Sequence, residues 1–298
     1  MEYIILDLEW DSEFFKPEKR FINHILQIGA IKLDEEFNVI DTFSVNIRSE
    51  ISNRVSGHFA KLTGISSDDM RHGIPFCDAV EKYNLFSKGA SVTMTWSDSD
   101  LHTIIENEEH ILCGKAKFNF NGYLDLQKFV QNHLYSKGYE DKNQISVENA
   151  AELLGFNTDG YELHTALDDC RVCALMLKQC YNEKLFNSMI RDTNTPDFYA
   201  RLKFKPYAIS DIHDENIEKS QLKFNCPECG GKTERIKAWK YRNRWFMSDF
   251  KCKNCGFMFN GRVMFKKTFD NVTVKRRVCE FKVKGKKTDD MQSVSEKV

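Results

Sequence analysis

The chain has 298 residues, of which 41% are hydrophobic and 29% charged, so it can bury a sizeable core and form about two globular domains. No apolar stretch approaches the ~20 residues that a membrane-spanning helix requires, so contact with a membrane is not expected. The net charge of −1 conceals a division, because residues 219–298 carry 21 Lys and Arg against 8 Asp and Glu, whereas residues 1–218 carry 22 against 36.

The first half of the chain predicts a mixed sheet. Three strands are expected at residues 3–10, 25–33 and 39–47, and their short connections favour antiparallel pairing. Residues 52–75 are rich in Ser, Asp and Gly and predict a loop with short turns. Helices then alternate with strands at 90–95 and 116–120; the helices are expected at 76–87, 101–109, 125–135, 146–154 and 164–181. This order predicts one α/β sheet flanked by helices.

The second half predicts a terminal helix and a linker, followed by a small β domain. We therefore expect an α/β domain at 1–185, a helix and linker at 186–222, a basic and aromatic domain at 223–285, and a disordered tail at 286–298. A strand that begins at Tyr3 leaves no room for a signal peptide, so we expect a cytoplasmic protein with reduced cysteines. Cys170, Cys173 and Cys180 recur at helical spacing and predict small core residues.

Two acidic residues end the first predicted strand. Asp7 and Glu9 in YIILDLEW project from one face, because strand side chains alternate. Two neighbouring carboxylates repel each other, and a hard divalent cation such as Mg²⁺ or Mn²⁺ removes that repulsion. The plain alternative is a strand end that becomes polar as it meets solvent.

Three further motif residues lie later in the chain. Asp100 lies in TWSDSD, and His164 and Asp169 lie in HTALDDC, at the opening of a helix. Asp168 competes with Asp169 for a ligand role, and helix geometry alone does not choose between them.

Together these motifs resemble the DEDDh group of 3′–5′ exonucleases. DLEW, TWSDSDL and HTALDD occur in the group's order, with ILQIGAIKLD similar to its second strand and KLTGIS to the loop after its third. The resemblance covers roughly residues 1–182 and is nearest the ERI-type and KapD-type branch. It selects Asp169 over Asp168, assigns Asp100 to the second motif, and leaves Asp98 as an extra acid.

The resemblance implies a ribonuclease H-like fold, with a five-stranded mixed sheet and its second strand antiparallel. It implies two Mg²⁺ or Mn²⁺ ions held by Asp7, Glu9, Asp100 and Asp169, which clamp the scissile phosphate ~4 Å apart. His164 would accept the proton of the attacking water, as an imidazole can near neutral pH. The expected activity is removal of nucleotides from the 3′ end of single-stranded or overhanging RNA or DNA, with RNA slightly favoured.

Two CxxCG motifs in the second half predict a zinc ribbon. Cys226 and Cys229 are separated by 22 residues from Cys252 and Cys255, and two thiolate pairs suit one tetrahedral structural Zn²⁺. The glycine after each pair permits a tight turn near the sulfurs. A redox dithiol would need only one pair.

Basic and aromatic residues alternate around these motifs. They can pair with phosphates and stack on bases, or the aromatics can build a small core while the basic residues face solvent. The residues singled out as candidate nucleic-acid contacts are Trp239, Arg242, Arg244, Trp245, Lys266 and Lys267. The alternatives to an exonuclease are a nucleic-acid-binding adaptor with a degenerate nuclease domain, or a ribbon that docks a protein partner. Protein partners cannot be named from the sequence.

Overall fold

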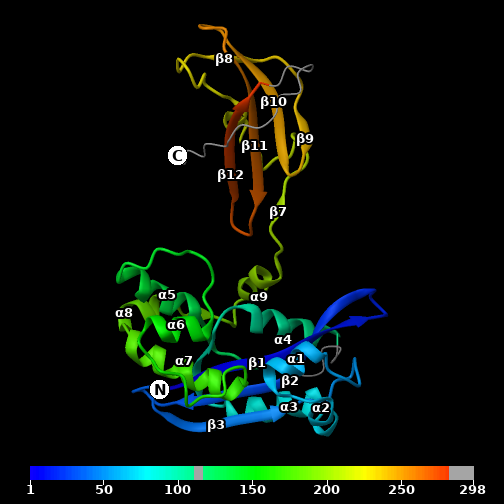
Figure 1. The fold of residues 1–298 in the computed structure, drawn as a ribbon, viewed down its shortest axis with the longest axis vertical. Helices are drawn as coiled ribbons and strands as arrows, with labels where there is room; N and C mark the ends of the chain where they lie inside the picture. Colours follow the sequence, from blue (N-terminus) through cyan, green and yellow to red (C-terminus); the bar gives the residue numbers. More distant parts are fainter. Residues whose placement is uncertain (111–116, 282–298) are drawn as a thin grey trace. The chain divides into compact units, whose positions relative to one another are not determined.

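The structure is a computed structural model that describes residues 1–110 and 117–281. The chain divides into two compact units, the first spanning Met1–Lys203 and the second beginning at Phe204. Figure 1 shows their elements.

A mixed sheet forms the centre of the first unit (Figure 1). Its strand order is β3-β2-β1-β4-β5-β6. The antiparallel part consists of β1 (Glu2–Phe15), β2 (Arg20–Leu33) and β3 (Val39–Asn46). β4 (Ala90–Thr95) and β5 (Gly122–Asp125) run parallel to β1, and the two-residue β6 (Arg191–Asp192) is antiparallel to β5. The predicted ribonuclease H-like sheet is therefore confirmed, with a short sixth strand added at its edge.

Helices cover both faces of this sheet, because β1 is apolar on both faces. Tyr3 and Ile5 face a core that includes α5 (Leu126–Ser136), α6 (Val147–Leu153), α7 (Ala166–Cys180) and α8 (Glu183–Met189). Ile4 and Leu6 face a second core with α3 (Phe76–Phe86), α4 (Ser99–His110) and α9 (Pro196–Lys203). The predicted core positions of Cys170, Cys173 and Cys180 are confirmed, since all three are buried against the first of these cores.

The fifth strand was predicted in the wrong place. It lies at Gly122–Asp125, whereas 117–120 is irregular and Ala116 lies outside the described residues. Phe118 and Phe120 are buried side by side with ring centroids 5.9 Å apart, so their apolar pattern reflects core packing and not strand pairing.

The segment at 52–75, predicted as a loop, contains two short helices. α1 (Gly57–Thr63) and α2 (Ser67–His72) are each capped by a serine, Ser56 and Ser66, whose side chain accepts a backbone N–H of the first turn. Helices of six and seven residues are too short for apolar periodicity to show. The segment at 186–222 is also richer in regular structure than a helix and a linker, since it holds the last turn of α8, β6, α9, β7 (Tyr207–Ala208) and a 3₁₀ turn, η1 (Lys219–Leu222).

The second unit is a twisted antiparallel sheet. β10 (Trp245–Cys252) and β11 (Met258–Lys267) form its centre, flanked by β12 (Val272–Glu280), β8 (Thr233–Arg235), β9 (Lys240–Arg242) and β7. Alternate residues of β10 are buried, so Phe246 and Phe250 reach a core with Phe259 and Phe265. The predicted tail at 286–298 lies outside the described residues.

None of the helices in the described ranges is long and apolar enough to cross a bilayer.

Candidate functional site

The predicted metal-binding carboxylates come from elements far apart in sequence. Asp7 and Glu9 lie on β1, opposite Gly29 and Gln27 of β2, and Asp169 lies in the first turn of α7. Carboxylate oxygens of Asp7, Glu9 and Asp169 lie within 4.8 Å of one another. The fold therefore gathers three of the predicted ligands at one point.

The close approach of α7 to β2 places Asp169 there. A Cβ added to Gly29 would lie only 2.5 Å from the backbone carbon of Ala166 and 2.6 Å from the nitrogen of Leu167. The side chain of Gln27 accepts the N–H of Ala166 at 3.1 Å, which satisfies one of the free donors at the start of α7. A glycine and a glutamine on β2 thus fix the position of the helix that carries Asp169.

Asp100 sits in the first turn of α4, just beyond the end of β4. It is buried, and its Oδ1 atom has no hydrogen-bond partner among the described residues. Burial raises the pKa of Asp7, and the charge of Asp100 adds to that effect. A buried carboxylate oxygen without a hydrogen-bond partner is suited to accept a cation.

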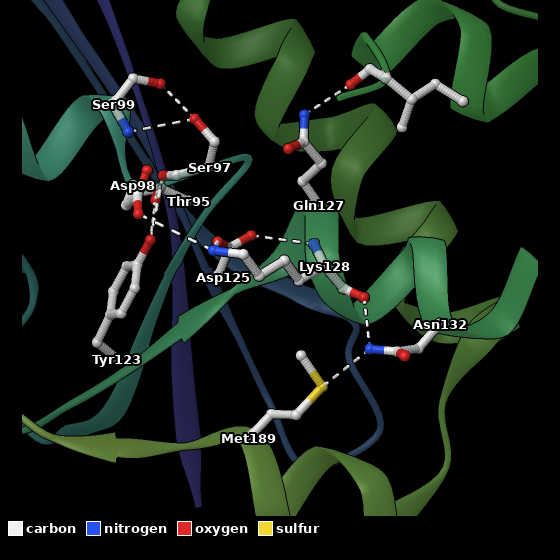
Figure 2. Close-up of polar contacts among 11 residues, drawn as sticks. Thr95, Ser97, Asp98, Ser99, Tyr123, Asp125, Gln127, Lys128, Asn132 and Met189 are labelled. Atoms are coloured by element: carbon white, nitrogen blue, oxygen red, sulfur yellow. Dashed lines mark hydrogen bonds and ion pairs between the residues drawn. The ribbon is translucent and has the colours of Figure 1, made fainter. Parts of the chain in front are cut away.

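A hydrogen-bond network holds the turn that precedes Asp100, from Thr95 to Ser99 (Figure 2). The hydroxyl of Tyr123 donates to the carbonyl of Ser97 at 3.1 Å, and the backbone of Ser99 donates to the Ser97 hydroxyl at 3.2 Å. The indole of Trp96 donates to the carbonyl of Ile145 at 2.8 Å. These bonds fix the direction in which α4 begins and therefore the position of Asp100.

All four carboxylates have raised pKa values, with burial as the largest cause. Burial raises the pKa of Asp7 well above its usual range, and the charges of Asp100, Asp169 and Glu9 add to the effect. Burial, with the charges of Asp169 and Asp100, raises the pKa of Glu9 to about 8. Burial also raises the pKa of Asp100 to about 7 and that of Asp169 to about 6. Such a cluster is strained when ionised and is relieved by positive charge.

These residues fit hard divalent cations. All the donors are carboxylate oxygens, which suit Mg²⁺ or Mn²⁺ better than softer metals. The raised pKa values and the unpartnered oxygen of Asp100 both point to the same missing positive charge.

The structure separates Asp169 from its neighbour Asp168. Asp168 accepts the backbone N–H of Glu162 at 2.9 Å and pairs with Arg171 at 2.6 Å, so it closes the turn before α7. Asp169 receives the backbone N–H of His164, and the nearby His164 lowers its pKa against the effect of burial. Asp169 is thus in the acidic cluster, and Asp168 stabilises the loop.

His164 lies just before α7, two residues ahead of its first turn. It is exposed and its φ is 70°, a left-handed conformation that a residue with a side chain rarely adopts. The predicted helix therefore begins at Ala166 and not at His164. An exposed imidazole held beside Asp169 by unusual backbone geometry suits a proton acceptor at the edge of the cluster.

Two other acids have structural roles. The side chain of Asp125 caps α5 by accepting the N–H of Lys128 at 3.0 Å, and it also pairs with the ammonium of Lys128 at 2.5 Å. Asp98 lies 3.9 Å from the same ammonium (Figure 2). The carboxylates of Asp125 and Asp98 both point towards α5 and lie outside the cluster of predicted metal ligands.

The four predicted zinc ligands meet in the second unit. The sulfur of Cys229 lies 3.5 Å from those of Cys252 and Cys255, and Cys226 lies 3.6 Å from Cys255. A tetrahedral site with Zn–S bonds of ~2.3 Å requires sulfurs slightly under ~4 Å apart, so the set fits Zn²⁺. Backbone N–H groups of Cys255 and Asn254 donate to Cys252 and lower the pKa of its thiol to about 6. Gly230 and Gly256 have φ values of 68° and 76°, so each turn does require glycine.

The predicted nucleic-acid contacts lie on several elements of the second unit. Trp239 is half-buried against Phe250, whereas Arg242 at the end of β9 and Arg244 in the turn before β10 are exposed. Trp245 is half-buried under the guanidinium of Arg277 at 5.1 Å. Lys266 and Lys267 lie on β11 beside β7. Of the six, only Trp239 lines the open pocket described below.

The sequence reasoning missed Gln27 and Gly29. The available signal was a glycine inside an otherwise apolar strand, which often marks a close approach of another backbone. Nothing in the sequence pattern indicated that the approaching segment would be α7.

Comparison with known proteins agrees with this geometry. The RNase_T family model, described as exonuclease, matches residues 9–177. The fold is similar to that of cell-death related nuclease 4, with a TM-score of 0.51, 18% identity and coverage of 64% of this chain and 65% of that one. It is also similar to the nuclease domain of 3′hExo, a DEDDh family member bound to rAMP, with a TM-score of 0.52, 21% identity and coverage of 65% and 96%.

No curated protein sequence matches the chain significantly. The structural likenesses confirm the fold, and the family model covers more than half of the chain. The resemblance to the DEDDh exonucleases is thereby confirmed, and the chain belongs to the RNase_T exonuclease family.

Proposed function

We propose that the first unit is a metal-dependent 3′–5′ exonuclease that shortens single-stranded or overhanging nucleic acid from its 3′ end, with RNA favoured over DNA. The observation that carries this proposal is the meeting of carboxylate oxygens of Asp7, Glu9 and Asp169 within 4.8 Å, with the buried Asp100 adding its charge to the effect on the pKa of Asp7. Burying several carboxylates together costs stability when they are ionised, and a divalent cation offsets that cost.

Divalent cations held by Asp7, Glu9, Asp100 and Asp169 would supply the positive charge that activates a water and stabilises the phosphate. The chain's own residues do the rest. The carboxylates hold fixed positions because α7 packs closely on β2 at Gly29, which pairs with Asp7 of β1, and because α4 begins in a fixed direction. His164 accepts the proton of the attacking water, and the ionised Asp169 beside it stabilises the imidazolium that forms.

The direction of cleavage and the preference for RNA are inferred by analogy with similar structures. A structure described as 3′-end specific recognition of histone mRNA stem-loop by 3′-exonuclease has a TM-score of 0.52 and 20% identity to this chain. The 3′hExo domain is described as bound to rAMP, a ribonucleotide. Both support a 3′ end and RNA as the first substrate to test.

The alternative, an adaptor with a degenerate nuclease domain, is disfavoured because every ligand position holds a carboxylate and His164 lies beside them. We also propose that Cys226, Cys229, Cys252 and Cys255 bind one structural Zn²⁺.

The test is digestion of 5′-labelled RNA and DNA in Mg²⁺, in Mn²⁺ and without added divalent cation. A 3′–5′ exonuclease gives a ladder that shortens stepwise, whereas the opposite direction releases the label at once. Asp7→Asn should remove activity, and His164→Gln should lower turnover by ~10²–10⁴ while metal binding remains. Full activity of the Asp7→Asn protein would overturn the assignment.

A further inference from the structure

The second unit contains an open pocket whose charged lining is entirely basic. Its volume is about 890 Å³. Lys219, Lys223, Lys232 and Arg235 line it together with His213, and no carboxylate side chain does. Among the described residues, none of the four cations makes an ion pair. A group of unpaired positive charges around a hollow is expected to attract an anion.

The acidic side chains nearby are occupied elsewhere. Asp211 and Asp214 accept backbone N–H groups of their own turns at 2.9 and 2.8 Å. Glu218 accepts the hydroxyl of Ser220 and the amide of Gln221. Glu234 faces Lys253 at 3.8 Å. These carboxylates are oriented by local turns or by another lysine, and none of them lines the pocket.

Aromatic rings form the floor of the pocket. Phe224 and Phe250 pack with ring centroids 5.0 Å apart, and Trp239 meets Phe250 edge-on at 5.7 Å. The guanidinium of Arg235 lies 5.9 Å from the Trp239 ring. Because Trp239 is only half-buried, it can offer a surface to a flat ligand. Rings beside cations suit the unpaired bases and phosphates of a single strand.

The first cysteine motif holds the walls of this pocket. Asn225 bridges to Lys232, the N–H of Cys226 donates to the carbonyl of Gly231 at 2.9 Å, and the hydroxyl of Thr233 donates to the carbonyl of Phe224. The chain before Cys226 and the chain after Gly231 therefore run side by side and present Lys223 and Lys232 to the same hollow. The four-cysteine cluster thus builds the pocket as well as the fold.

We propose that this pocket binds a segment of single-stranded nucleic acid, with phosphates on Lys223, Lys232 and Arg235 and a base against Trp239. The identification of that strand as the enzyme's own substrate rests on the proposed exonuclease function. The charge division supports it, because residues 1–218 have an excess of 14 acidic charges and residues 219–298 an excess of 13 basic charges. A polyanion is repelled by the first segment and attracted by the second.

The test compares two pairs of substitutions in the full chain, each removing two positive charges from the second unit. The pocket pair is Lys223→Gln with Lys232→Gln. The control pair is Lys240→Gln with Lys275→Gln, two exposed lysines that do not line the pocket. Both are made in the Asp7→Asn background so that the labelled strand is not degraded.

Binding is followed by fluorescence anisotropy with oligouridylate and oligodeoxythymidylate, longer than the ~4–16 nucleotides that a single-strand-binding module covers. The pocket pair should weaken binding at least tenfold and reduce the slope of log Kd against log salt by about 1.4, since each lost phosphate contact contributes about 0.7. The control pair should change Kd by less than about threefold. Zinc content and melting temperature confirm that both variants are folded.

Equal losses from the two pairs would mean diffuse attraction and would overturn the pocket. Binding that is unchanged in the pocket pair would also overturn it, as would a preference for polyglutamate over both oligonucleotides. The exonuclease proposal fails separately, if the wild-type chain binds the strand through this pocket but never shortens it. Conversely, if the chain shortens the strand stepwise and the pocket pair does not change binding, the exonuclease proposal stands and the pocket proposal fails.

Discussion

Gly29→Ala tests whether close packing of α7 on β2 assembles the acidic cluster. The added Cβ would lie 2.5 Å from the Ala166 carbon, 2.6 Å from the Leu167 nitrogen and 2.7 Å from the Ala166 Cβ. Two of these atoms are backbone and cannot rotate away, so the start of α7 must move by about 1 Å to reach ordinary contact. Asp169, in that first turn, must move with it.

Two effects of this movement can be measured. Overpacking of this kind typically costs about 1–3 kcal/mol, and in a unit of this size each kcal/mol lowers the melting temperature by about 2–4 °C. A displacement of about 1 Å at a catalytic group can lower the rate by about 10²-fold. The assay is single-turnover cleavage at saturating Mn²⁺, performed well below the melting temperature of the variant.

Gly57→Ala is the matched control. Gly57 opens α1, its φ is not left-handed, and a Cβ there would meet nothing within 4 Å. This variant should cleave at the wild-type rate and gain up to about 1 kcal/mol from the lower entropy of its unfolded chain. If Gly29→Ala matched Gly57→Ala in both cleavage rate and melting temperature, the role given to the close approach would be refuted.

Three further predictions concern the two sites. Asp169→Asn should remove metal-dependent cleavage. Asp168→Asn should keep the rate within about tenfold and lose at most about 1 kcal/mol of stability, because its amide oxygen can still accept the N–H of Glu162 and only the ion pair with Arg171 is lost. The reverse outcome would mean that the two acids were assigned the wrong way round. Without Mg²⁺ or Mn²⁺, the melting temperature of the first unit should fall as pH rises from about 5 to 8. The raised pKa values of Glu9, Asp100 and Asp169 mean that the folded state binds more protons than the unfolded chain in this range, so a rise in pH favours unfolding. Added Mg²⁺ should flatten this dependence in thermal-shift measurements, and a flat profile without metal would contradict the repulsion argument. Cys252→Ser should release zinc and make the second unit sensitive to limited proteolysis, while residues 1–203 stay resistant to the protease. The reason is that structural zinc contributes folding free energy directly. Equal protease resistance of the zinc-free protein would argue against a structural metal.

Local sequence patterns predicted much of the fold. The apolar runs at β1, β2 and β4 and the periodicity of α3, α5 and α7 were visible in the chain, because each of these elements buries a regular face. The two CxxCG motifs likewise marked their ligands, since the chemistry and the turn lie within a few residues. Patterns failed where burial was irregular, as at Phe118 and Phe120, or where helices were as short as α1 and α2.

The sequence by itself supplied the chemical identities of the acidic cluster, and its motif spacing favoured Asp169. Only the tertiary structure placed Asp168 in the turn before α7 and brought the cluster together, through a glycine on β2 that admits the helix. It also showed that Trp239, alone among the six basic and aromatic candidates, lines the open pocket of the second unit. The physical reason is the same in each case: residue type sets what a side chain can do, whereas its partners are set by contacts between segments distant in sequence.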